Sequence, residues 1–222
     1  MRSCDLQRQT FFVFMKILNL YAGIGGNRKL WGDSHEITAV EYNQEIADIY
    51  KDYFPNDTVI VADAHQYLLD HFDKYDFVWT SPPCPTHSRL QSMIIHNTNR
   101  IVYPNMSLYQ EIIVLQNWFK GKFLVENVIP YYTPLIPPTA KLHRHIYWSN
   151  FPINYFKVTN NRKHQEINNN SIVYGFNLKR YNSKNKAQIL KNMVDPELGQ
   201  HILNTAQGII TKQNIEQTEL EF

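Results

Sequence analysis

The stretch KILNLYAGIGG, residues 16–26, joins a short apolar run to a turn that holds three of the chain's eight glycines. The apolar run predicts a buried β-strand over residues 16–20, and a helix is expected to begin near Asn27. Glycines between a strand and a helix let the backbone turn sharply and come close to a ligand, towards which the helix N–H groups point. The stretch therefore predicts the first unit of an α/β fold with a ligand-binding turn.

Four later segments repeat the short apolar run of a buried strand: Glu36–Glu41, Thr58–Ala62, Phe77–Thr80 and Lys122–Glu126. Two sets of side chains between them have the spacing of one helix face: Ile46, Ile49, Tyr50 and Tyr53, and Leu108, Ile112, Leu115 and Phe119. This alternation predicts a doubly wound, mostly parallel sheet with helices on both faces. A last helix is expected over residues 196–209, because Asp195 is a good N-cap and Pro196 suits the first helical position.

Composition restricts the class of protein. The chain has 222 residues, 43% of them hydrophobic and 19% charged, and no apolar run reaches the ~18 residues that would span a bilayer. Its two cysteines, Cys4 and Cys84, provide no disulfide framework and favour a reducing compartment. We therefore expect a soluble cytoplasmic protein with no membrane contact. The scattered histidines and the lack of Cys pairs predict no metal site.

Three regions flank the predicted core of residues 15–151. Residues 1–14 differ in composition from the strand that follows, so we expect an extension or an alternative start. Residues 157–191 carry eight basic side chains against one acid, and lysine and arginine gain affinity for a polyanion by releasing its counterions. We expect residues 152–191 to form a small basic binding segment, with a solvated Asn-rich loop as the alternative. Residues 192–222 are expected to pack a helix on the core and to end in an acidic tail.

Acidic residues follow the second and third predicted strands. Glu41 could accept both hydroxyls of a ribose, Tyr42 could stack on an adenine, and Asp63 could accept from an exocyclic amino group. For each acid alone, a surface or helix-capping role is the alternative. Their placement at successive strand ends beside the glycine turn predicts a site for a nucleoside cofactor.

A cysteine follows the fourth predicted strand, after Ser81, Pro82 and Pro83. Cys84 is therefore expected at the carboxyl edge of the sheet, where open α/β sheets bind ligands, although a free cysteine can also be a small buried hydrophobe. Nearby His87 and Arg89 could lower the pKa of the thiol from about 8.5, or contact a phosphate.

Two polar clusters come later in the chain. Glu126 and Asn127 follow an apolar strand and are expected at the same edge, where apolar walls would raise the pKa of the carboxyl group and let it donate to a ring nitrogen. The second cluster, His143-Arg144-His145, enters a further strand-like segment. A surface role or a phosphate contact is the alternative for that cluster.

With these residues in view, the chain resembles the DNA (cytosine-5)-methyltransferases over most of residues 15–151, and more weakly in its last helix. The resemblance rests on the glycine turn, on Glu41-Tyr42 and Asp63, on Pro83-Cys84, and on Glu126-Asn127-Val128. It implies a Rossmann-like methyltransferase fold with S-adenosylmethionine as cofactor. The residues implied to bind the cofactor are Tyr21, Ala22, Gly23, Gly25, Gly26, Glu41, Tyr42, Asp63, Ala64 and Pro83.

The resemblance also implies a reaction. Cys84 would attack C6 of a cytosine flipped out of double-stranded DNA, with Glu126, Asn127 and Arg144 as the other catalytic residues. The polar segment of residues 85–104 would close over the DNA. The implied DNA contacts are His87, Ser88, Arg89, Arg162, Lys163, Lys179, Arg180, Lys184 and Lys186. The short segment of residues 152–190 is similar to that of small phage-type or mobile-element enzymes, for which we expect a monomer and a possible partner restriction endonuclease.

The chain departs from the family at several positions. Pro85 stands where the family usually has glutamine, Tyr21 where phenylalanine is usual, and residues 143–145 hold one arginine where the family has an Arg-x-Arg pair. An RNA cytosine-5 methyltransferase and a catalytically silent nucleic-acid-binding homologue therefore stay open. An amino-methyltransferase is disfavoured because Cys84 replaces the aromatic residue of its Ser-Pro-Pro-Tyr motif. A nicotinamide-dependent oxidoreductase is disfavoured because the glycines stand too close together.

Overall fold

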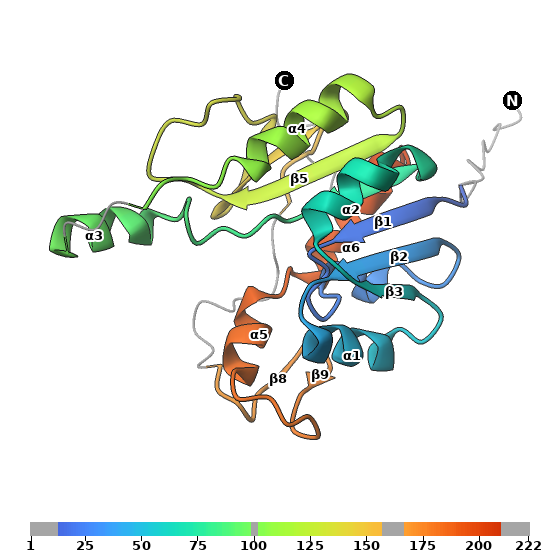
Figure 1. Cartoon of the computed structure of the whole chain (residues 1–222). Coiled ribbons are helices and arrows are strands. Elements are labelled where there is room, and N and C mark those ends of the chain that lie inside the picture. Colours follow the sequence, from blue (N-terminus) through green and yellow to red (C-terminus); the bar gives the residue numbers. More distant parts are fainter. Residues whose placement is uncertain (1–12, 99–101, 157–166, 210–222) are drawn as a thin grey trace, which may run out of the picture.

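The computed structural model describes residues 13–98, 102–156 and 167–209. Its centre is a seven-stranded sheet in the order β3-β2-β1-β4-β5-β7-β6, with helices on both faces (Figure 1). Strands β1 to β5 run parallel, and β7 runs antiparallel to both of its neighbours. The predicted doubly wound, mostly parallel sheet is confirmed.

The predicted strands lie close to where the sequence places them. The main sheet comprises β1 (Lys16–Leu20), β2 (Glu36–Glu41), β3 (Thr58–Val61), β4 (Phe77–Thr80), β5 (Lys122–Val128), β6 (Ala140–Leu142) and β7 (His145–Ser149). Strand β3 is one residue shorter than predicted, and β5 continues two residues further because β7 pairs with it as far as Val128. A separate two-stranded hairpin is formed by β8 (Ile172–Val173) and β9 (Phe176–Asn177).

The helices bring three corrections. They are α1 (Gln44–Tyr53), α2 (Ala64–His71), α3 (Arg89–Thr98), α4 (Ser107–Trp118), α5 (Lys186–Asn192) and α6 (Pro196–Ala206), with 3-10 turns η1 (Asn27–Leu30) and η2 (Phe72–Lys74). The helix expected near Asn27 is only the single turn η1, because Gly32 at φ +71° redirects the chain. Residues 85–104, expected as an open loop, contain α3. The last helix ends at Ala206, three residues early, although its predicted cap is confirmed, with Asp195 accepting from Glu197 N and Leu198 N.

Alternate residues of the central strands pack on opposite faces of the sheet. Ile17 pairs in register with Phe77, and both belong to the cluster that α6 covers. Leu18 pairs with Val78, and both pack against the buried face of α4. All four side chains are fully buried, so the sheet is apolar on both faces and each strand reads as a continuous apolar run.

A smaller lobe packs against α1. The ring of Phe176 in the β8–β9 hairpin lies 4.7 Å from the ring of Tyr53, and Asn177 N donates to the Tyr53 hydroxyl at 2.7 Å. The lobe belongs to the predicted basic segment of residues 152–191, of which residues 157–166 lie outside the described residues. In the part of the chain that the structure describes, no helix is long and apolar enough to cross a bilayer.

Helix α6 lies directly on η1, and this contact requires a glycine. A Cβ added to Gly199 would lie 2.3 Å from the carbonyl oxygen of Asn27, a backbone atom that cannot rotate away. The Trp31 indole also donates to the Gly199 carbonyl at 3.1 Å, which fixes the helix against the turn. Close approach of the two backbones therefore positions the chain directly after the glycine turn.

Gly199→Ala should lower the free energy of unfolding by about 1 to 3 kcal/mol, as overpacking of a tight contact does. Chemical denaturation of the purified protein measures this change. Gln200→Ala, on the next residue of the same helix, is the matched control, because it loses only a side-chain bond to Asn204. Equal stability of the two variants would show that α6 moves away from η1 without cost.

Candidate active site

The glycine turn after β1 is held by the carboxylate of Glu41. Gly23 N donates to Glu41 Oε2 at 3.0 Å, and Asn43 N donates to Oε1 at 3.0 Å. Tyr21, Gly23 and Gly25 have positive φ angles of 55°, 56° and 82°, so the turn adopts a conformation that is costly for a residue with a side chain. Glu41 thus ties the end of β2 to the turn that follows β1.

Glycine is required at the three positions of this turn for different structural reasons. A Cβ on Gly25 would meet the rings of Tyr50 and Phe54, and one on Gly26 would meet Met193 and the backbone of Val194. A Cβ on Gly23 would meet nothing within 4 Å. Gly25 and Gly26 therefore allow tight packing within the fold, whereas Gly23 leaves open space where a ligand can approach the backbone.

The other predicted cofactor residues lie around this turn. Asp63 is the N-cap of α2, where Oδ1 accepts from Gln66 N at 2.9 Å, and Ala64 is buried as the first residue of that helix. Tyr42 is 77% exposed, so its ring is free to cover a bound group but packs against little of the protein itself. Glu41, Tyr42 and Asp63 all follow the carboxyl ends of their strands, as predicted.

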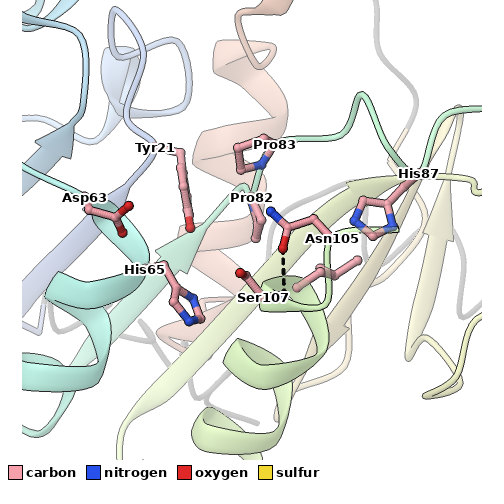
Figure 2. Close-up of a pocket in the computed structure, with 9 residues that line it drawn as sticks. Tyr21, Asp63, His65, Pro82, Pro83, His87, Asn105 and Ser107 are labelled. Atoms are coloured by element: carbon pink, nitrogen blue, oxygen red, sulfur yellow. Dashed lines mark hydrogen bonds between the residues drawn. The ribbon is translucent and has the colours of Figure 1, made fainter. Parts of the chain in front are cut away.

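A cavity opens between the glycine turn, α2 and the start of α4. Its empty volume is about 410 Å³ with the open mouth included. Figure 2 shows Asp63 and Tyr21 at one end and His87 beyond Asn105 at the other. The lining residues are Tyr21, Asp63, His65, Pro82, Pro83, His87, Asn105, Ser107 and Leu108. The space, the aromatic ring of Tyr21 and the acceptor oxygens of Asp63 fit an adenosine group.

The segment that leads to Cys84 is fixed by β5. Ser81 Oγ donates to Glu126 Oε2 at 2.9 Å, and Asn127 Nδ2 donates to the Pro82 carbonyl at 3.0 Å. Glu126 and Asn127 are only 6% and 3% exposed, whereas Cys84 is partly exposed and carries a free thiol. The structure therefore brings the cysteine segment and the Glu126-Asn127 pair together, as the sequence predicts.

Comparison with known proteins places these residues in a family. The family described as C-5 cytosine-specific DNA methylase matches residues 15–130, which include the glycine turn, Cys84 and Glu126. The chain belongs to this family. S-adenosylmethionine is the cofactor that the family implies, and the cavity beside the glycine turn fits its adenosine part.

Individual relatives match parts of this family member. A tRNA (cytosine(38)-C(5))-methyltransferase from Mus musculus is 30% identical over 82 residues, 34% of this chain and 20% of that protein. The chain thus spans about a fifth of the length of this curated relative. Among solved structures, a DNMT2 variant from Spodoptera frugiperda is 29% identical over 51% of this chain and 35% of that one, with a TM-score of 0.35. A SAM-dependent methyltransferase from Agrobacterium tumefaciens is 15% identical over 55% and 41%, with a TM-score of 0.41.

The thiol of this C-5 cytosine methylase family member is not activated by nearby cations. Burial raises the pKa of Cys84, and the negative charge of Glu126 raises it further. His87 is 1% exposed and bonded to the Tyr132 hydroxyl, and burial lowers the pKa of its imidazole, which favours the uncharged form. Arg89 is exposed at the start of α3. The expectation that His87 or Arg89 lowers the pKa of the thiol is therefore wrong.

In the basic cluster of residues 143–145, the side chain that lies near Glu126 is not the one that the sequence singled out. Arg144 lies in the exposed turn between β6 and β7, and no described residue forms an ion pair with its side chain. His145 Nε2 instead lies 3.8 Å from Glu126 Oε1, across the antiparallel β5–β7 pair. Sequence reasoning missed His145. The alternation of side chains along a strand was the signal that could have found it, since His145 and Tyr147 share one face.

The predicted nucleic-acid contacts fall in two places. Ser88 and Arg89 lie directly after the Cys84 turn, and Figure 1 shows α3 projecting from the body beyond the ends of the parallel strands. In the smaller lobe, Arg180 pairs with Asp52 at 3.3 Å and Lys186 Nζ donates to the Lys179 carbonyl, while Lys179 and Lys184 are exposed. Arg162 and Lys163 lie outside the described residues.

The raised pKa of Cys84 can be measured directly. In the free protein, alkylation of Cys84 by iodoacetamide should reach its half-maximal rate at a higher pH than in the urea-denatured chain, because only the thiolate reacts. Mass spectrometry of the peptide that contains Cys84 follows the reaction in both states. A lower midpoint in the folded protein would show that a positive charge activates the thiol before any substrate binds.

Proposed function

We propose that the protein transfers a methyl group from S-adenosylmethionine to C5 of cytosine in DNA. One observation carries this proposal: Ser81 links Glu126 to the segment that ends at Cys84, so a nucleophile and a proton donor lie at one sheet edge. The adenosine cavity shares Pro82 and Pro83 with that segment. A base that reached Cys84 would therefore lie next to a cofactor bound in the cavity.

The side chains suit the chemistry of a carbon nucleophile. The sulfur of Cys84 would form a bond to C6 of the cytosine, and the displaced electrons would move to N3, where Glu126 donates a proton. C5 would then be nucleophilic enough to take the sulfonium methyl group that the cofactor supplies when bound. Water would then take the C5 proton, the electrons of that C–H bond would restore the C5–C6 double bond, and the bond from sulfur to C6 would break to release the Cys84 thiolate. The proton on N3 would return to Glu126.

The raised pKa of Cys84 fits a nucleophile that is activated only by its substrate. In the free protein the negative charge of Glu126 disfavours the thiolate. A hydrogen bond between Glu126 and N3 of a bound base would offset this repulsion. The same carboxyl group would therefore activate the base and permit ionisation of the thiol.

The surroundings of the site suit a polyanionic substrate whose base is flipped out. An enzyme that acts on an atom inside a duplex extrudes the base at a cost of a few kcal/mol, and contacts to phosphates help to offset that cost. The exposed Lys179 and Lys184 of the smaller lobe and Arg89 on α3 are suitable phosphate contacts. We propose that these two regions hold the nucleic acid on either side of Cys84.

RNA is the second candidate substrate. The Mus musculus relative is named for its action on cytosine 38 of tRNA, and its matched segment is 30% identical to this chain. The attack at C6 and the donation to N3 concern the base alone, so they apply equally to cytosine in DNA and in RNA. The contacts to the sugar and the strand would decide between them.

Cys84→Ser should abolish methylation and leave binding of S-adenosylmethionine nearly unchanged, because serine is a poor nucleophile of similar size. Wild-type protein and the variant should be incubated with duplex DNA and with transcribed tRNA, and 5-methylcytosine then mapped at base resolution. Marks on DNA that require Cys84 would support the proposal. Marks confined to RNA would select the second candidate, and full activity of the variant would refute the cysteine mechanism.

Glu126→Gln should slow turnover by about 10²- to 10⁴-fold, the usual contribution of a positioned proton donor. Single-turnover rates at saturating cofactor and substrate would measure the effect. Glu36→Gln, at the exposed start of β2, is the matched control because it removes the same charge far from Cys84. A wild-type rate for Glu126→Gln would exclude proton donation by this side chain.

A further inference from the structure

Glu111 is a buried carboxylate that the sequence did not single out. It lies on α4 with 0% exposure, and three side chains from three other segments donate to it. The Tyr21 hydroxyl donates to Oε1 at 2.6 Å, the Thr80 hydroxyl donates to Oε2 at 2.6 Å, and His65 Nδ1 lies 3.0 Å from Oε1. Both carboxylate oxygens of Glu111 therefore act as hydrogen-bond acceptors.

His65 supplies the charge that balances it. Its Nδ1 faces Glu111 Oε1, and its Nε2 lies 3.1 Å from Gln110 Oε1, so both ring nitrogens face acceptors. Both bonds form together only when both nitrogens carry a proton, which makes the ring an imidazolium. The hydrogen bond to Glu111 is the main cause of a raised pKa of His65, which agrees with this protonation state.

The three partners of Glu111 belong to the parts of the site that must be aligned. Tyr21 forms the aromatic wall of the adenosine cavity and has a positive φ of 55°. His65 lies two residues after Asp63, in the same cavity lining. Thr80 is the last residue of β4, directly before the segment that leads to Cys84. One buried carboxylate therefore touches the glycine turn, the Asp63 end of α2 and the cysteine strand.

We infer that Glu111 is a positioning residue that, paired with His65, holds the Tyr21 hydroxyl and so fixes the wall of the cofactor cavity. The inference rests on the proposed cofactor site and deepens it. Tyr21 stands where the family usually has phenylalanine, which has no hydroxyl group to donate to a carboxylate such as Glu111. Glu111 orders the cavity before the cofactor arrives, which reduces the entropy lost on binding.

The pairing of Glu111 with His65 makes the order of the cofactor cavity depend on pH. The groups that face His65 are Glu111 and Gln110 from α4, the acidic cap Asp63 of its own helix, and the Tyr21 hydroxyl that shares Glu111. Because the pKa of His65 is raised in the folded protein, its stabilising effect is complete below the ordinary histidine pKa of about 6.5. That effect is lost as the pH rises through the folded value.

The first test measures the affinity for S-adenosylmethionine by calorimetry, with no methyl transfer required. Tyr21→Phe and Glu111→Gln should each weaken binding about tenfold, and the double variant should bind no more weakly than Glu111→Gln alone. Tyr155→Phe is the control, because this hydroxyl lies on an exposed side chain outside the cavity lining. Circular dichroism verifies that each variant is folded, and Tyr21→Phe keeps the test valid if Glu111→Gln does not fold.

The second test varies the pH and gives a readout without any ligand. Thermal stability of the free wild-type protein, and its affinity for S-adenosylmethionine, should both fall as the pH rises through the pKa of His65, whereas His65→Gln should show neither dependence. If Tyr21→Phe and Glu111→Gln both bind S-adenosylmethionine as tightly as the wild-type protein, the role of Glu111 is overturned and the proposed function is not. Failure of the wild-type protein to bind S-adenosylmethionine at all would instead overturn the proposed function.

Discussion

The register of the parallel β4–β5 pair is the constraint on which the site depends. Thr80 pairs in register with Val125, so the chain leaves β4 beside the point where β5 presents Glu126 and Asn127. The amide of Asn127 then donates to the Pro82 carbonyl, and Ser81 donates to Glu126. A parallel register shifted by one residue would turn Glu126 to the opposite face of the sheet and break both contacts. The same pairing that stabilises the sheet therefore places the segment leading to Cys84 beside the carboxyl group of Glu126.

Buried charges hold the remaining parts of the site in place. Arg28 and Asp57, both 3% exposed, form an ion pair of 2.9 Å behind the glycine turn, and the Tyr50 hydroxyl donates to the same carboxylate. The buried Glu111 and the partly exposed His65 form a second pair, and Glu111 also accepts from Tyr21 at the start of that turn. Such pairs pay a large desolvation cost and add little net stability, but removal of one partner leaves an uncompensated charge, which is strongly destabilising. They are therefore better suited to fixing one arrangement of the turn than to raising overall stability.

The surroundings of Cys84 disfavour its thiolate form in the free protein. The pKa of Cys84 is raised by burial and by Glu126, and the neighbouring histidine is buried and bonded to tyrosine. Positive potential was the simplest expectation from the sequence around Cys84, because His87 and Arg89 follow it closely. Tertiary packing reversed this expectation, since it draws the His87 ring into the protein and leaves Arg89 on an exposed helix. Oxidation of a cysteine is favoured by thiolate character, so a raised pKa also protects the partly exposed Cys84 thiol.

The sequence by itself determined the five parallel strands and the glycine turn, because continuous apolar runs and glycine spacing are local properties of the chain. It also determined that Cys84, Glu126 and Asn127 share one edge, since parallel strands end on the same side of a sheet. Only the tertiary structure decided that Gly25 and Gly26 serve packing, that His145 rather than Arg144 approaches Glu126, and that the buried Glu111 accepts from Tyr21 of the cavity lining. These contacts join residues far apart in the chain, and no local pattern records which buried acid will meet which hydroxyl group.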